Sequence, residues 1–133
     1  MIFYKKRRRY KYTLFADYQH QTELRMAQPV QIGNVVSLET NGLLTIKKGY
    51  AWDGPSGPTI DTPNFMRGSL VHDAFYQLMR EELISQDHRT YADRLLRKIC
   101  LEDGMSAIRA WWVYKAVQLY GASSATPDLK KAP

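Results

Sequence analysis

The spacing of apolar residues changes character near the middle of the chain. Residues 10–18, 31–38 and 43–48 form short runs rich in β-branched and aromatic side chains, which is typical of strands. Asn41 and Gly42 separate the last two runs, and both residue types tolerate the positive φ angles of a tight hairpin turn. This part of the chain is therefore predicted to form a small, mostly antiparallel sheet.

Beyond residue 65 the apolar positions recur every three or four residues, as they do on one face of a helix. The pattern predicts helices over 66–83, 90–103 and 106–120. Asn64 is expected to cap the first helix, and Gly104 and Gly121 are expected to end the second and third. The second helix has an apolar stripe of Ala92, Leu95, Leu96 and Ile99. Asp93 lies at the edge of that stripe and can point inward.

The third predicted helix is apolar on nearly every side, which is typical of the buried centre of a helix bundle. Its apolar residues are Ile108, Trp111, Trp112, Val113, Val117 and Leu119. We therefore expect Trp111 and Trp112 to serve packing, with room for one of the two rings at an interface.

These patterns predict a single α+β domain, in which a small N-terminal antiparallel sheet precedes a three-helix unit. A chain of 133 residues is long enough for one hydrophobic core. The expected segments of the domain, residues 1–121, are a basic strip over 1–12, the sheet over 10–50, a loop over 51–64 and the helices over 65–121. Residues 122–133 have the composition of a flexible tail.

The cysteine content and the lack of long apolar segments both favour the cytoplasm as the compartment of this protein. Cys100 is the single cysteine, so no intramolecular disulfide can form, and its place in an apolar stripe predicts a buried thiol rather than a nucleophile. No apolar run reaches the ~20 residues of a membrane-spanning helix. The N-terminus lacks the apolar segment of a signal peptide. We expect a product of the cytoplasm with no transmembrane segment.

The net charge of +6 is concentrated near the N-terminus. Basic residues gather there at Lys5, Lys6, Arg7, Arg8, Arg9 and Lys11, while the other 13 basic residues balance the 13 acidic ones. Such a strip, interleaved with aromatic residues, fits the phosphates of nucleic acid or of an anionic lipid surface. An equally weighted alternative is a solvated edge strand whose charges discourage edge-to-edge pairing.

The most informative stretch is a turn-rich loop over residues 51–64 that leads into a helix carrying His72 and Asp73. A histidine can act as a general base near neutral pH when a partner fixes its tautomer. Neighbouring residues on a helix diverge by about 100°, so Asp73 is poorly placed to orient His72. It is better placed to bind a hard cation that prefers oxygen ligands. Backbone carbonyls of the loop are candidate ligands for the same cation.

Asp93, arriving from the second helix, is the candidate that would orient His72, with Tyr76 helping to hold Asp93. If the first helix ran to residue 84, the side chains of His72 and Asp93 would be offset by about 10 Å along the helix axes. An equally weighted alternative is that His72 and Asp73 are hydrogen-bonded structural residues. Zinc proteases, zinc ribbons and nucleotide-binding loops are excluded because their motifs are absent. Pro58 stands where a nucleophile elbow requires glycine.

The HDAFY sequence of residues 72–76, followed by Ala92 and Asp93, resembles the catalytic core of phospholipase A2 enzymes. It is most similar to the disulfide-free phospholipase A2 domain of parvovirus capsid proteins, and the resemblance covers residues 50–100. It implies that His72 activates a water molecule, that Asp93 orients His72, and that Tyr76 is the partner of Asp93.

The same resemblance implies a calcium ion. Its ligands would be the carboxylate of Asp73 and main-chain carbonyls of the loop, at Trp52, Gly54 and Gly57. The loop sequence WDGPSGPTID departs from the usual glycine-rich calcium loop in its prolines and acids. Asp53 and Asp61 are therefore either additional ligands or residues that stabilise turns.

The whole chain, through its WDGPSGPTID, HDAFY, ADRLLR and RAWWVYKAV segments, also resembles a small bacteriophage-encoded family of uncharacterised function. Two hypotheses follow. One is a calcium-dependent lipid esterase acting on host envelope phospholipid, held at an anionic phospholipid surface by its basic N-terminus. The other is a non-enzymatic virion component, such as a tail, baseplate or capsid-associated protein, that binds other phage virion proteins. Both place the product in the host cytoplasm, with incorporation into the virion as a further step. Nucleic-acid binding through residues 5–11 is a third hypothesis.

Overall fold

Among the residues that the structure describes, all the strands precede all the helices along the chain. The computed structural model describes residues 2–6, 12–52, 62–121 and 125. The chain divides into two compact units, Met1–Gly54 and Pro55–Pro133. The fold is therefore α+β, with antiparallel sheet in the first unit and three α-helices in the second.

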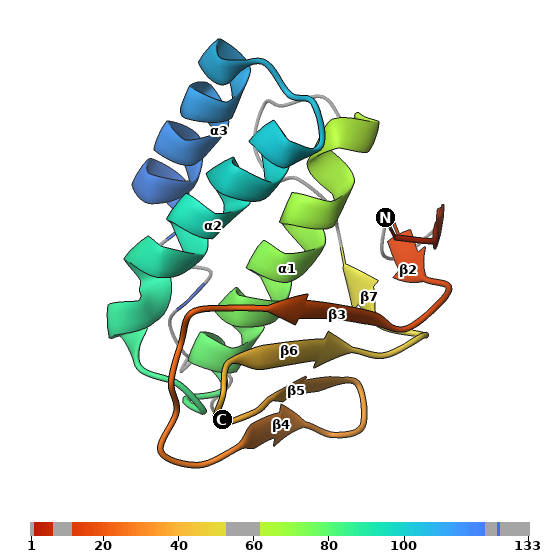
Figure 1. The fold of residues 1–133 in the computed structure, drawn as a ribbon, viewed down its shortest axis with the longest axis vertical. Coiled ribbons are helices and arrows are strands. Elements are labelled where there is room, and N and C mark those ends of the chain that lie inside the picture. The colour runs from red at the N-terminus through yellow and green to blue at the C-terminus, as the bar shows by residue number, and fades with distance from the viewer. Residues whose placement is uncertain (1, 7–11, 53–61, 122–124, 126–133) are drawn as a thin grey trace, which may run out of the picture. The chain divides into compact units, whose positions relative to one another are not determined.

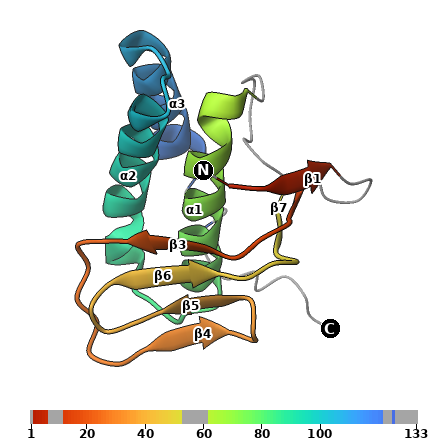
Figure 2. The same cartoon turned by 45° about the vertical axis from the view of Figure 1, so that its right-hand side comes forward.

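Two small antiparallel sheets make up the first unit (Figure 1). The three-stranded sheet has the order β1-β2-β7, with β1 at Tyr4–Lys6, β2 at Tyr12–Leu14 and β7 at Ala51–Trp52. The four-stranded sheet has the order β3-β6-β5-β4, which is easily followed in Figure 2. Its strands are β3 at Tyr18–Gln21, β6 at Leu43–Ile46, β5 at Val36–Leu38 and β4 at Val30–Ile32.

The hairpin predicted at Asn41 and Gly42 is confirmed, because β5 pairs with β6 across this turn and Gly42 has a φ of 91°. Two predicted strands are each divided. The run 31–38 is a hairpin, since Gly33 has a φ of 48° and turns the chain between β4 and β5. The run 10–18 separates into β2 and β3. Between them Asp17 accepts a hydrogen bond from the Lys48 backbone N–H at 2.7 Å instead of extending a strand.

The second unit contains α1 at Pro63–Arg80, the short 3₁₀ helix η1 at Gln86–His88, α2 at Arg89–Glu102 and α3 at Ala107–Tyr120. The three predicted helices are confirmed, but Asn64 is not the first N-cap. That position is Thr62, with Pro63 directly inside the helix, where its fixed φ and missing N–H are tolerated. Asn64 lies in the first turn and accepts a hydrogen bond from the Thr62 hydroxyl at 2.6 Å.

α1 and α2 pack closely against each other near Gly68. A Cβ atom at this position would lie 2.9 Å from the Cδ1 atom of Leu96 and 3.1 Å from the sulfur of Cys100, so only glycine fits without displacement. The ends of the two helices are also joined by charge. Arg67 on α1 forms ion pairs with Glu102 at 2.9 Å and with Asp103 at 3.0 Å.

Cys100 is buried, as predicted, in a core that contains residues of all three helices. The members of this core are Phe65, Leu96, Cys100, Met105, Ala110 and Val113. Burial raises the pKa of the Cys100 thiol to about 12, and the nearby carboxylate of Asp103 adds to the shift. The thiol is therefore protonated at neutral pH, which removes its nucleophilic form.

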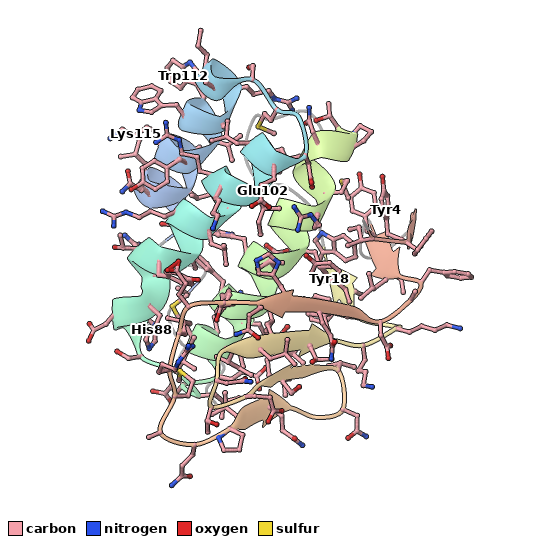
Figure 3. The ribbon with its side chains drawn as sticks, in the orientation of Figure 1. Tyr4, Tyr18, His88, Glu102, Trp112 and Lys115 are labelled. Carbon is pink, nitrogen blue, oxygen red and sulfur yellow. The ribbon has the colours of Figure 1, made fainter. Side chains whose placement is uncertain are left out.

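The prediction that α3 is the buried centre of the bundle is wrong. Only one side of α3 packs inward, through Ala110 and Val113, while Trp111 and Trp112 are both exposed. In Figure 3 Trp112 and Lys115 project from the outer side of α3. The nearly uniform apolar character of this helix thus reflects two apolar faces, of which one is solvent-exposed. None of the described helices combines the length and apolar character that crossing a membrane requires.

Candidate active site

Three polar side chains meet where α1 packs on α2. His72 and Tyr76 lie one turn apart on α1, and Asp93 faces them from α2. The Nε2 atom of His72 lies 2.7 Å from Asp93 Oδ1, and the Tyr76 hydroxyl donates a hydrogen bond to the same oxygen at 2.6 Å. Two segments 21 residues apart in sequence therefore form one hydrogen-bonded network.

The network assigns the protons of the imidazole ring. An ionised carboxylate is only an acceptor, so His72 Nε2 carries the hydrogen that is donated to Asp93. In the neutral ring Nδ1 is then the nitrogen that can accept a proton. This is the tautomer that a general base needs, and it is fixed by a partner on another helix.

The network is buried. The side chain of Asp93 is 1% exposed and that of His72 is 9% exposed, while Tyr76 is 3% exposed. The His72 and Tyr76 rings are packed with their centroids 4.1 Å apart, which restricts rotation of the imidazole. Burial raises the pKa of the Tyr76 phenol well above its usual range, and the hydrogen bond to Asp93 raises it further. Tyr76 is therefore a donor throughout the physiological pH range.

The length of α1 decides whether the network can form. α1 ends at Arg80, four residues before the position that would have offset the side chains. The Glu81 backbone N–H donates the last helical hydrogen bond to the Gln77 carbonyl. Glu82 then adopts a φ of 61°, which turns the chain away from the helix axis. α2 then starts at Arg89, four residues before Asp93, and brings that carboxylate level with His72 and Tyr76.

Gly121 also supports the network, and the sequence pattern identified it only as the end of a helix. A Cβ atom at Gly121 would lie 2.6 Å from the Tyr76 hydroxyl oxygen and 2.4 Å from the Val117 carbonyl oxygen. The backbone after α3 therefore packs directly against the phenol of Tyr76. Gly121 has a φ of −83°, so this close approach, and not an unusual backbone conformation, explains the glycine.

The charges around the network are mixed. Arg89 acts on the Tyr76 phenol from α2 and lowers its pKa, while Asp73 acts on it from α1 and raises the pKa, both less strongly than burial. Asp73 is partly buried, and its position next to His72 in sequence does not bring it into the His72–Asp93 bond.

The calcium ligands expected in the loop lie largely outside the described residues. Gly54, Gly57, Asp53 and Asp61 all fall in the segment 53–61. Trp52 lies in β7 of the first unit, where its ring packs against that of Tyr12 with centroids 5.6 Å apart. Among the residues that the structure describes, no group of three His, Cys, Asp or Glu side chains is arranged to hold a metal ion.

The basic strip is described only in part. Lys5 and Lys6 belong to β1, which is an edge strand of the three-stranded sheet. Protection of this sheet edge by basic residues stays a prediction. Arg7, Arg8, Arg9 and Lys11 lie outside the described residues. Binding of nucleic acid or lipid by this strip stays a prediction.

The fold and the buried His–Asp–Tyr network define an α+β protein with a candidate acid–base site on a helix pair. A comparison with protein families then identifies the chain: its residues 33–117 match the family DUF1353, described as proteins of unknown function, and the chain belongs to that family. The matched segment contains α1 and α2 with all three residues of the network. Searches of curated proteins and of solved structures returned no match.

Proposed function

We propose that the protein is a phage-encoded lipid esterase of phospholipase A2 type that hydrolyses host envelope phospholipid. The single observation that supports this proposal most strongly is the 2.7 Å bond between His72 Nε2 and Asp93 Oδ1. This bond gives the imidazole a fixed tautomer. The resemblance of residues 72–76 and 92–93 to phospholipase A2 is the reason for proposing hydrolysis of a phospholipid ester.

In the proposed reaction, His72 Nδ1 takes a proton from a water molecule as the water oxygen bonds to the ester carbonyl carbon. The bond between that carbon and the leaving alcohol oxygen then breaks, and the imidazolium returns its proton to the alcohol. Asp93 stabilises the positive charge that His72 carries between these two steps. Tyr76 holds Asp93 in place by donating to the oxygen that also accepts from His72.

A calcium ion would stabilise the negative charge that develops on the ester carbonyl oxygen in this proposal. Asp73 is the described residue suited to hold it, since its carboxylate is an oxygen ligand for a hard cation. The remaining oxygens would come from the loop at residues 53–61. Calcium dependence is tested separately from the role of His72, by removing calcium with a chelator.

The proposal is tested by measuring release of fatty acid from phospholipid vesicles with calcium present. We expect His72→Asn to reduce the rate at least about a hundredfold, because the general base is lost. His88→Asn is the matched control, since His88 lies in the same unit before α2 and outside the network. Equal rates for His72→Asn and the unchanged protein would contradict the mechanism. Excess chelator should abolish activity if calcium takes part.

The depth of the network favours a second candidate function, a non-enzymatic virion component. Asp93 is 1% exposed, and its hydrogen bonds also join α1 to α2, which is a structural role in itself. This candidate expects the protein at fixed stoichiometry in purified phage particles and no release of fatty acid. Activity lost in His72→Asn and kept in His88→Asn would argue against it.

A further inference from the structure

The exposed side of α3 is apolar over most of its length. Ile108 is 74% exposed, Trp112 63%, Leu119 73% and Trp111 41%. The stripe consists, in chain order, of Ile108, Trp111, Trp112, Lys115 and Leu119. Successive members are three, one, three and four positions apart, so all five lie within an arc of about 100° around the helix. A continuous exposed apolar stripe of this kind is unusual on a soluble surface and indicates a binding partner.

The opposite side of α3 shows that packing within the unit does not require this stripe. Ala110 and Val113 are buried in the helical core and Val117 packs against it. The Trp111 and Trp112 rings contact each other edge to face, with centroids 5.4 Å apart. The exposed rings are thus held in position on the surface without taking part in the core.

The charged residue within the stripe is positive. Lys115 lies within the stripe, and its Nζ atom is 5.7 Å from the centroid of the Trp111 ring. On the neighbouring helix α2, Arg94 and Lys98 are also exposed. Of the acidic residues of α2 and its C-cap, Asp93 is buried, and Glu102 and Asp103 share the single charge of Arg67. Lys115 is therefore the charge within the stripe that can meet an anionic surface.

We propose that the outer face of α3, formed by Ile108, Trp111, Trp112, Lys115 and Leu119, docks on the interfacial region of an anionic phospholipid bilayer. Tryptophan rings favour the boundary between acyl chains and headgroups, aliphatic side chains gain by entering the acyl region, and lysine can extend to the phosphates. The inference rests on the proposed function in that it names the surface through which a lipid esterase would reach its substrate.

Two other occupants fit the face less well. In a symmetric contact between two copies, the same patch meets itself, so the Lys115 charges of both copies would be brought into one apolar interface. Nucleic acid would stack on the tryptophans. It would offer nothing apolar to Ile108 and Leu119, which are the most exposed residues of the stripe.

The test is co-sedimentation of the chain with vesicles of phosphatidylglycerol and phosphatidylcholine, compared with phosphatidylcholine alone. We expect binding to the anionic vesicles and a loss of about tenfold or more in Ile108→Ser/Trp112→Ser, since two apolar side chains leave the interface. Lys115→Gln should weaken binding about fivefold. Phe15→Ser is the matched control, because Phe15 is an exposed aromatic residue of the first unit, 56% exposed.

Tryptophan fluorescence gives a second measurement. Trp52 is 2% exposed, so a shift of emission to shorter wavelength on adding vesicles must come mainly from Trp111 and Trp112. Because all substituted side chains are exposed, unchanged circular dichroism is expected and verifies that the variants are folded. Vesicle binding that Ile108→Ser/Trp112→Ser retains, and that is lost when the basic residues 5–11 are replaced, would overturn the inference. A dimer dissociated by the same double variant, with no vesicle binding, would overturn it too.

Docking and catalysis are separable in this design. His72→Asn should bind vesicles as well as the unchanged protein does. Vesicle binding without release of fatty acid by the unchanged protein would leave the docking surface standing and reject the esterase. Hydrolysis of dispersed short-chain phospholipid without vesicle binding would reject the docking surface and leave the esterase standing.

Discussion

Each compact unit buries a polar side chain, and the two sites are built very differently. In the first unit the Thr22 hydroxyl donates to the Gly42 carbonyl at 2.6 Å and accepts from the Leu24 N–H at 3.2 Å. In the second unit the Asp93 carboxylate accepts from His72 and Tyr76. Both sites satisfy their hydrogen bonds. One uses a neutral hydroxyl bonded to two backbone groups, and the other uses ionisable groups on separate helices.

The Thr22 and Asp93 sites differ in the cost of burying the polar group and in the chemistry that the group allows. A neutral hydroxyl bonded to the backbone closes a turn at small cost, and it offers no proton-transfer chemistry. Burying a carboxylate is far more costly unless it is fully hydrogen-bonded, so its retention is better explained when the charge has a use.

The largest effect is expected from Asp93→Ala. It leaves the buried Nε2–H of His72 and the hydroxyl of Tyr76 without their acceptor, and removing one partner of a buried charged network costs about 3–5 kcal/mol. Urea denaturation followed by circular dichroism measures the loss. Asp93→Asn keeps the size of the side chain and an acceptor oxygen, so it should unfold at a higher urea concentration than Asp93→Ala does.

Tyr76→Phe should lower the free energy of unfolding by about 1.5–3 kcal/mol, the usual value of a hydrogen bond to a charged group. It should also change the pH dependence. The folded protein holds the phenol proton above the ordinary pKa of 10.0, where the unfolded chain has released it. The stability contributed by Tyr76 is therefore complete below pH 10 and falls as the pH rises further.

The Tyr76→Phe variant should accordingly lose stability less steeply above pH 10 than the unchanged protein. Denaturant titrations at several alkaline pH values measure this slope. Identical slopes for both proteins would show that neither burial nor the hydrogen bond to Asp93 raises the pKa of the Tyr76 phenol.

Gly121→Ala should cost about 1–3 kcal/mol, because the added methyl group overlaps the Tyr76 hydroxyl and the Val117 carbonyl. If the proposed mechanism holds, release of fatty acid should fall as well, since Tyr76 would no longer hold Asp93. Gly104→Ala is a suitable control. A Cβ atom there meets no atom within 4 Å, and the backbone alone is strained by its φ of 96°. Gly104→Ala should destabilise the helices without a specific effect on the rate.

The smallest effect is expected from Thr22→Val in the first unit. The variant loses two neutral hydrogen bonds, one to the Gly42 carbonyl at 2.6 Å and one from the Leu24 N–H at 3.2 Å. The Leu24 bond is long and only part-buried, so the expected loss is about 1 kcal/mol. The Gly42 carbonyl keeps the N–H of Thr22 as a donor at 3.1 Å. Thermal unfolding measures the loss, and release of fatty acid should be unchanged. A fall in rate as large as that expected of His72→Asn would remove the contrast between the two sites.

The helical unit was predictable because its apolar spacing is strong. The stripe around Asp93 gave both the helix and the inward direction of the carboxylate, and the one-turn separation of His72 and Tyr76 put both on one face. The early end of α1 was not predictable, because the apolar pattern continues past Arg80 while Glu82 adopts a φ of 61°. Such a turn depends on tertiary packing rather than on residue type.

Other features escaped prediction for related reasons. The sequence pattern of a helix with two apolar faces is the same whether the second face packs on protein or is exposed. The exposure of Trp112 could therefore not be deduced from composition. The role of Gly121 depends on a phenol 45 positions away in sequence, and a glycine after a helix already has a sufficient local explanation. The turn at Gly33 was missed because the β-branched residues on either side suggested one continuous strand.

Gly68 places a geometric limit on how this protein can vary. It lies one helical turn before His72, at the point where the absence of a side chain allows α1 to approach Leu96 and Cys100. A methyl group there would separate the helix axes, and the hydrogen bond one turn further along would lengthen with them. A position without any functional group of its own would thus determine whether imidazole and carboxylate remain within reach, and relatives with a larger residue there should carry compensating reductions at 96 or 100.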